Sequence, residues 1–135
     1  MNGTFDTVER AIEAAETLLP GTAAPDDAAE DPRWQAMTEI GRFIASDPAP
    51  IWAFIQRWGS TPDEDLSDAI ATCLLEHLLE RYFEVYFPLA ESHVRANPRF
   101  ARTVWMCWEP EGLRSQPENL QRFKALKREV LGWKR

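Results

Sequence analysis

The amino-acid sequence predicts an all-α protein whose helices form antiparallel pairs, arranged as a short α-solenoid or as a compact helical bundle. The chain has 135 residues, of which 44% are hydrophobic, and this size suits one main domain around one core. It contains 17 Ala and 12 Leu but only 11 Val and Ile together, a balance that favours helices over strands. The positions of the prolines and the spacing of the apolar residues also indicate helices.

Proline marks the predicted starts of four helices. In each case a side-chain acceptor stands before the proline, so the acceptor can cap the helix and the proline can occupy its first position, where a missing N–H costs nothing. The pairs are Asp31-Pro32, Asp47-Pro48, Thr61-Pro62 and Asn97-Pro98. Two further patterns fit a capping box, in which two side chains bond each other's free backbone N–H groups: Thr61 with Glu64, and Ser115 with Glu118.

Residues 5–19 predict a one-sided amphipathic helix that lies on the outside of the protein. Its apolar stripe consists of Phe5, Val8, Ile12, Ala15 and Leu19. The segment 20–30, PGTAAPDDAAE, has no large apolar side chain and is typical of a flexible linker. We therefore divide the chain into an N-terminal helix with its linker, residues 1–30, and a helical domain, residues 31–135.

Apolar stripes predict five more helices, over about residues 32–46, 48–58, 62–87, 98–108 and 117–133. The segment 62–87 carries apolar residues on two opposite sides, which places it between two neighbouring helices. Pro88 is expected to kink or end this central helix, so that residues 89–96 form only a short helical turn. The sequence EPEG at 109–112 breaks the chain before the last helix.

The net charge of −7 is unevenly distributed along the chain. Residues 1–94 carry 18 acidic and five basic side chains, whereas residues 95–135 carry ten basic and four acidic ones. An acidic body argues against nucleic acid as a ligand, because phosphate binding requires a basic surface, and it favours a protein partner with a basic surface. The lack of a long apolar run or a signal peptide, together with only two cysteines, predicts a cytoplasmic protein that does not contact a membrane.

The central segment contains a polar cluster, CLLEHLLERYFE, at residues 73–84. His77 lies three or four residues from Cys73, Glu80 and Arg81, which makes these side chains neighbours on a helix, and Glu84 lies one turn beyond Glu80. The simpler interpretation is a histidine that is hydrogen-bonded within a helix interface. A second interpretation is a metal or ligand site, although zinc and di-iron sites ordinarily bring more ligands. We predict no metal and no cofactor.

The remaining residues of chemical interest predict packing rather than catalysis. Cys73 and Cys107 stand in apolar surroundings, without the neighbouring base that a thiolate nucleophile needs, and no glycine-rich phosphate loop occurs. Enzymatic activity is therefore not predicted. Most of the six tryptophans fall on helical stripes, but Trp52, Trp105 and Trp133 lie toward the edges of theirs, and an exposed tryptophan is a common anchor of a protein interface.

Four acidic residues crowd the turn that opens the central helix: Asp63, Glu64, Asp65 and Asp68. Acidic side chains suit a helix N-terminus, and no basic residue stands near them in the sequence. They form either a solvated cap or a patch that steers a basic partner by long-range attraction.

The stretch WGSTPDEDLSDAIATCLLEHLLERYFEVYFP, followed by FARTVWMCW, resembles a group of small bacterial proteins with HEAT-like helical repeats. Members of that group have a charged turn, an Asp-Leu pair, an Ala-Ile-Ala-Thr-Cys start and a Leu-Leu-Glu-His-Leu-Leu-Glu body, and the resemblance covers about residues 40–126. The matching positions are Asp65, Leu66, Cys73, Glu76, His77, Glu80, Cys107 and Trp108. Such proteins continue Lys-Phe-Gly-Gln where this chain has Glu109-Pro110-Glu111-Gly112. The resemblance implies a helical-repeat scaffold, and such scaffolds mostly bind proteins.

We therefore expect a non-enzymatic protein-interaction module, of the immunity or antidote type, that binds a basic partner. The residues expected to contact the partner are Asp63, Asp65, Asp68, Glu80, Arg81, Glu84 and Trp105. The alternative is a small metal- or ligand-binding helical protein that uses Cys73, His77 and Glu80. A third interpretation is a homodimer formed through exposed helix faces.

Overall fold

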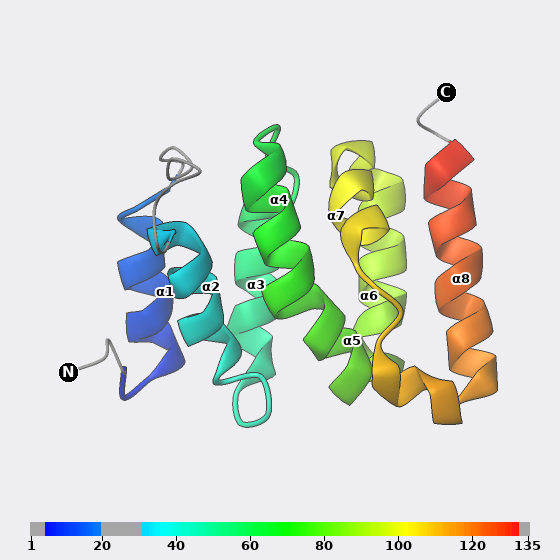
Figure 1. Ribbon diagram of the computed structural model, residues 1–135, viewed down its shortest axis with the longest axis horizontal. Coiled ribbons are helices and arrows are strands. Elements are labelled where there is room, and N and C mark those ends of the chain that lie inside the picture. The colour runs from blue at the N-terminus through cyan, green and yellow to red at the C-terminus, as the bar shows by residue number, and fades with distance from the viewer. Residues whose placement is uncertain (1–4, 20–30, 133–135) are drawn as a thin grey trace.

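The computed structural model describes residues 5–19 and 31–132, and every regular element in these residues is helical, which confirms the all-α prediction. The helices stand side by side in a row that runs from α1 at one end to α8 at the other (Figure 1). The α-helices are α1 Val8–Glu16, α2 Pro32–Gly41, α3 Pro48–Trp58, α4 Glu64–Ile70, α5 Glu76–Arg81, α6 Phe83–Ala96, α7 Ala101–Met106 and α8 Pro117–Gly132. Between them lie a π-helical turn, η1 Ala71–Leu75, and two 3-10 turns, η2 Pro98–Phe100 and η3 Glu111–Ser115.

The central segment of the chain is a succession of α4, η1, α5 and α6 instead of one helix. The prediction that the helix ends at Pro88 is wrong, because α6 continues through Pro88 and the chain breaks instead at Tyr82, whose φ of −133° and ψ of 51° are not helical. The Tyr82 hydroxyl donates to the carbonyl oxygen of Ala45 at 2.5 Å and holds this break in place. Pro88 then lies in the second turn of α6, where its missing N–H removes only the bond to the Glu84 carbonyl. Residues 89–96 form the second half of α6.

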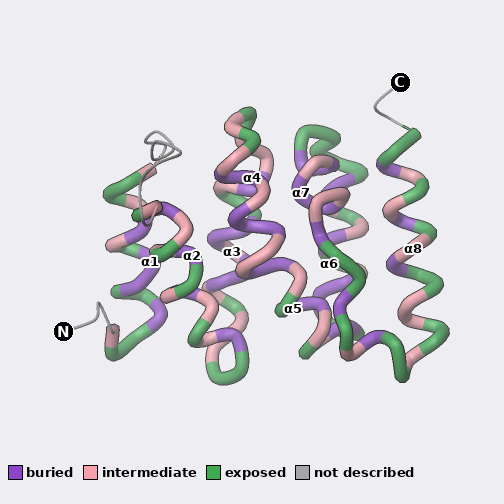
Figure 2. Tube along the Cα trace, in the orientation of Figure 1, coloured by how far each residue is buried: buried purple, intermediate pink, exposed green. Residues whose placement is uncertain are grey.

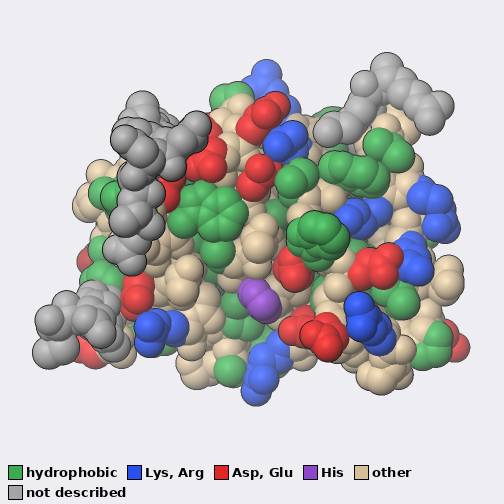
Figure 3. All heavy atoms as spheres, in the orientation of Figure 1, with side chains coloured by type: hydrophobic (Ala, Val, Ile, Leu, Met, Phe, Trp, Pro, Cys, Tyr) green, Lys and Arg blue, Asp and Glu red, His purple; other side chains and the backbone are tan. Residues whose placement is uncertain are grey.

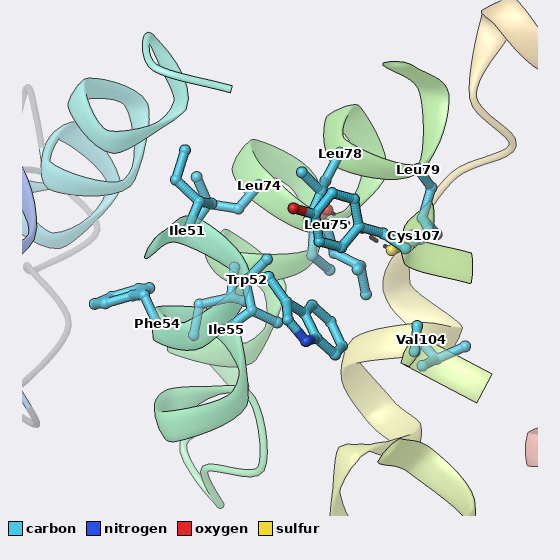
Figure 4. Close-up of a cluster of buried hydrophobic side chains, with 14 of the residues drawn as sticks. Ile51, Trp52, Phe54, Ile55, Leu74, Leu75, Leu78, Leu79, Val104 and Cys107 are labelled. Carbon is cyan, nitrogen blue, oxygen red and sulfur yellow. Dashed lines mark hydrogen bonds between the residues drawn. The ribbon is translucent and has the colours of Figure 1, made fainter. Parts of the chain in front are cut away.

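Both apolar sides of the central segment are buried, as the spacing predicts. Its main apolar side chains are at most 3% exposed: Leu66, Ile70, Leu74, Leu75, Leu78 and Leu79. Figure 4 shows the four last-named leucines between Ile51 and Ile55 of α3 and Val104 of α7. One continuous cluster of buried side chains runs through the described helices (Figure 2).

The π-helical turn η1 lies close to the backbone of α2. A Cβ atom at Gly41, the last residue of α2, would meet the carbonyl oxygen of Cys73 at 3.1 Å, so the missing side chain permits this approach. From the other side, the buried Cys107 thiol donates to the carbonyl oxygen of Ala71 at 3.7 Å. A π turn holds one residue more than an α turn, so the residues after η1 are rotated about the helix axis relative to those before it.

The N-terminal helix α1 is docked on α2 and α3. Its apolar face is buried, with Val8 and Ala15 at 1% and 0% exposure. The Glu16 carboxylate at its end accepts a hydrogen bond from the Trp58 indole at 2.8 Å and forms an ion pair with Arg57 at 3.0 Å. The helix therefore contributes to the common core, whereas the predicted linker, residues 20–30, lies outside the described residues.

The sequence predicts the N-cap of α2 correctly but misplaces the N-cap of α4. The Asp31 carboxylate accepts the backbone N–H of Arg33 at 2.8 Å, as predicted. Thr61 does not cap α4; the cap is Asp63, which accepts the N–H of Leu66 at 3.2 Å, while the Thr61 hydroxyl accepts the N–H of Asp63. The capping Asp63 also accepts a hydrogen bond from Arg33. The pairs Asp47-Pro48 and Asn97-Pro98 begin helical elements without a side-chain cap bond.

Deletion of residues 1–30 should leave a fragment, 31–135, that still unfolds cooperatively but is less stable than the full chain. Removing α1 uncovers the surface on which Val8 and Ile12 are buried, and burial of each such side chain contributes about 1.5–3 kcal/mol. We expect the free energy of unfolding, measured in urea, to fall by about 3–6 kcal/mol. An unchanged free energy would show that α1 does not stabilise the fold, and a fragment without a cooperative transition would show that it is not separable.

His93 of α6 is enclosed by aromatic rings. Its ring centroid lies 4.7 Å from that of Phe100 and 5.9 Å from that of Trp52. Its Nε2 atom is buried without a hydrogen-bond partner in the described part of the chain, and burial lowers the pKa of His93 below its ordinary value. Burial therefore disfavours the charged form of this imidazole.

Protonation of His93 should destabilise the fold. The unfolded chain binds this proton with a pKa of about 6.5, and the folded pKa is lower, so between the two values the unfolded state binds more protons. The free energy of unfolding should therefore fall as pH decreases through about 6.5 towards the folded pKa. His93→Phe, which keeps an aromatic ring, should remove this part of the pH dependence in urea unfolding between neutral and mildly acidic pH. Parallel pH profiles for the variant and the parent would contradict the prediction.

Candidate protein-interaction surface

Two carboxylates of the acidic cluster at the start of α4 contact a buried arginine. Arg33 of α2 is only 2% exposed, and its guanidinium donates to Asp63 at 2.8 Å and to Asp65 at 3.0 Å. The Trp34 indole N–H donates to Asp65 as well, at 3.2 Å. The Arg33 guanidinium holds the pKa of Asp63 below its ordinary value. These carboxylates therefore join α2 to α4.

Asp68, on the next turn of α4, is neutralised from α7. The Arg102 guanidinium contacts Asp68 at 3.1 Å and Glu64 at 3.8 Å. The sequence shows no basic residue near this cluster, and the interpretation that it lacks nearby bases is wrong. The fold brings Arg33 and Arg102 to it, from 30 and 34 residues away in the sequence. The cluster at the start of α4 is thus part of a structural network in which two guanidinium groups contact four carboxylates.

His77 does not lie in the apolar face of the central segment. Its side chain is 54% exposed, and its nearest charged neighbour is Glu80, whose oxygen lies 3.9 Å from the imidazole Nδ1. The rotation introduced by η1 explains this difference, because the continuous α-helix assumed from the sequence would place His77 in line with Leu66 and Ile70. The described residues contain no group of three or more potential ligands that could hold a metal ion.

An open groove runs between the end of α2 and the η1–α5 segment, with a volume of about 800 Å³. Cys73, His77, Glu80 and Arg81, the cluster that the sequence singles out, all line it. Burial raises the pKa of the Cys73 thiol, so a thiolate is disfavoured there. The lining of the groove is mixed: charged and polar side chains such as Arg42 and Glu80 alternate with apolar ones such as Ile44.

The two glutamates of α5 bind the backbone of the segment that follows α7, residues 107–112. Glu76 accepts the backbone N–H of Trp108 at 3.2 Å, and Glu80, one turn later, accepts the N–H of Gly112 at 2.7 Å. From α8, the Lys127 ammonium donates to the carbonyl oxygen of Cys107. A Cβ atom at Gly112 would lie 2.9 Å from Cγ of Glu80, so glycine permits this close approach. Three side chains from two helices thus fix the 107–112 segment.

The Trp108 side chain projects from this fixed segment and is 73% exposed, the highest value for a large hydrophobic residue in the described chain. The sequence places Trp108 on the buried stripe of a helix over 98–108, but α7 ends at Met106 and Cys107 is extended, with ψ at 130°. Trp105, which we expected at the surface, is half-buried beneath the Lys127 ammonium, 5.1 Å from its ring centroid. Trp52 is 8% exposed, and Trp133 lies outside the described residues.

Burial acts on the charged groups that hold the 107–112 segment. Burial raises the pKa of Glu76 above its ordinary value and lowers that of Lys127, because both groups are partly removed from water. Burial also raises the pKa of the Cys107 thiol far above its ordinary value. Acidic and apolar side chains are close together on this face of the molecule (Figure 3).

The two remaining predicted contact residues, Arg81 at the end of α5 and Glu84 on α6, do not hold the 107–112 segment. Glu84 of α6 forms an ion pair with Arg122 of α8 at 3.3 Å. Arg81 is exposed, with its guanidinium 6.0 Å from the centroid of the Tyr82 ring. Of the predicted contact residues, only Glu80 and Arg81 border the groove.

Comparison with known proteins gives no relative for this chain: no family model, no curated protein and no solved structure matches it. Within residues 5–19 and 31–132, no helix has both the length and the apolarity that a bilayer span requires.

Glu80→Ala should destabilise the protein, whereas His77→Ala should not. Removing the Glu80 carboxylate leaves the Gly112 N–H without its acceptor, which costs about 1–3 kcal/mol. His77 is exposed, so its truncation should change the free energy of unfolding by no more than about 0.5 kcal/mol. Urea unfolding of the two variants beside the parent measures both values. Equal losses would show that the carboxylate does not hold the 107–112 segment.

Proposed function

We propose that this chain is a non-enzymatic protein-interaction module with a HEAT-like helical scaffold, and that it binds a basic protein in the manner of an immunity or antidote protein. The observation that carries the proposal is the 73% exposure of Trp108 on a segment that hydrogen bonds from α5 and α8 hold in place. The contact surface consists of Trp108, the groove beside α5, and the carboxylates between them.

A fixed tryptophan is an efficient anchor for a partner. Binding ordinarily costs free energy because side chains and loops must be ordered, and here the backbone at Trp108 and Gly112 is already held by Glu76 and Glu80. Tryptophan also buries a large area and is among the residues most often found at the energetic centre of interfaces. The exposed indole would therefore contribute strongly once a partner covers it.

The charge of this surface favours a basic partner. Glu76 and Glu80 bond to backbone N–H groups, which carry no net charge, whereas the acidic residues at the start of α4 contact arginines. Glu111 is exposed next to them, and the whole chain carries a net charge of −7. Lysine or arginine side chains of a partner would complement these carboxylates and would accelerate association at low salt.

The groove continues this surface away from Trp108. Glu80 lines the groove and also holds Gly112, so the groove and the 107–112 segment share a wall. A partner that places an apolar pocket over Trp108 can extend a polypeptide segment along the groove. In an immunity or antidote role, this chain covers the surface that the partner needs for its own activity.

Truncation of Trp108 should weaken partner binding, while truncation of an exposed leucine elsewhere should not. The full chain, Trp108→Ala and Leu131→Ala serve as parallel baits in affinity capture, since Leu131 is also exposed, at 38%, but lies on α8. A protein captured by the parent and by Leu131→Ala should bind Trp108→Ala about tenfold or more weakly in a titration. Its association rate with the parent should fall as salt rises. Equal affinity for all three baits would contradict the proposal.

A further inference from the structure

The corner between α6 and η2, residues 93–100, is built around Asn97. The backbone of Asn97 leaves the helix, with φ at −133° and ψ at 83°. Its N–H donates to the carbonyl oxygen of His93 at 2.8 Å, and its carbonyl oxygen accepts the N–H of Phe100 at 2.8 Å. The side-chain amide adds two contacts to His93: its nitrogen lies 3.2 Å from the carbonyl oxygen and 3.3 Å from the imidazole Nδ1. Asn97 therefore joins the end of α6 to the start of η2.

These two side-chain contacts determine which nitrogen of the His93 ring carries the proton. The amide nitrogen of asparagine is a donor only, so the Nδ1 atom that faces it accepts a hydrogen bond. The proton of the neutral ring is then on Nε2. Turning the Asn97 amide over would place its oxygen 3.2 Å from the His93 carbonyl oxygen, where two acceptors repel each other. The carbonyl oxygen thus fixes the amide nitrogen toward the ring.

We propose that the α6–η2 corner is an acid-sensitive joint, in which the Asn97 amide responds to the protonation of His93. The second proton adds to Nδ1 and converts this acceptor into a donor. The Asn97 amide nitrogen, 3.3 Å away, then faces another donor and has to leave. Its departure also removes its bond to the His93 carbonyl oxygen, so the last turn of α6 loses a side-chain cap and η2 is loosened.

The surroundings of His93 supply neither a new acceptor nor a balancing charge. Nε2 is buried without a partner among the described residues, between the Trp52 ring of α3 and the Phe100 ring of η2. Burial, and not a neighbouring charge, lowers the pKa of His93. The other ionisable side chains of α3, α6 and η2, with those that pair with them, are Asp47, Arg57 with Glu16, Tyr82, Glu84 with Arg122, Tyr86, Arg95 with Glu91 and Glu129, and Arg99.

This proposal is independent of the proposed function. The 107–112 segment is held from α5 and α8, and no residue of the α6–η2 corner lines the groove beside α5. Loss of the acid response would leave the Trp108 surface unchanged, and loss of partner binding in Trp108→Ala would leave the acid response unchanged.

NMR of the two imidazole rings tests the hydrogen bonds of the joint. In the parent, neutral His93 should carry its proton on Nε2 and titrate below about 6.5. Asn97→Asp replaces the donor that faces Nδ1 with a carboxylate, which should raise the pKa of His93 by about one unit or more. His77→Ala identifies the other ring and should leave His93 unchanged. A neutral His93 with its proton on Nδ1, or a pKa that Asn97→Asp does not raise, would overturn the proposal.

Amide hydrogen exchange of the full chain tests the opening. After correction for the intrinsic effect of pH on exchange, opening at the Asn97 and Phe100 amides should rise about tenfold for each pH unit below about 6.5, down to the folded pKa, because one proton is taken up. These amides should stay less protected than the middle of α8 at every pH, since the opening is local. In Asn97→Asp the corner should instead be better protected in mild acid than at neutral pH. Equal protection of the corner and of α8, or an opening that does not depend on pH, would contradict the proposal.

Discussion

The fold depends on the burial of the central segment from both sides. The α4–η1–α5 segment packs against α2 and α3 on one side and against α6 and α7 on the other. Leucines at 74, 75 and 78 are fully buried, so this segment cannot rotate or shift without uncovering one of its two apolar sides. The rotation at η1 and the break at Tyr82 therefore determine how the described helices on both sides are oriented, and which polar residues reach the surface.

The predictions from sequence that succeed are those that depend on neighbours along the chain. The Asp31 cap, the prolines that open α2 and α3, and the two-sided burial of the central segment follow from local spacing. Contacts between distant segments leave no such signal. Arg33 meets Asp63 across 30 residues, and the π turn that exposes His77 has no distinct composition. For Trp108, the EPEG break directly after it was the available sign that its helix ends early.

The uneven charge along the chain is partly cancelled by folding. Basic residues of the C-terminal part contact acidic residues that precede them: Arg102 with Asp68, and Arg122 with Glu84. Pairs of this kind on a surface contribute little stability, but they decide where charge remains to act at a distance. At the start of α4 the carboxylates are matched by guanidinium groups, whereas on α5 they are matched by neutral N–H groups. Both regions also contain basic groups, since Arg33 and Arg102 contact the α4 cluster and Lys127 acts on Glu76.

The two glutamates of α5 stand at half-buried positions. The raised pKa of Glu76 shows that its charge is disfavoured there, and a packed apolar side chain would ordinarily be cheaper. What the carboxylates supply instead is fixed geometry for the backbone that carries an exposed tryptophan. Residues that reduce stability locally are expected at positions where function requires them.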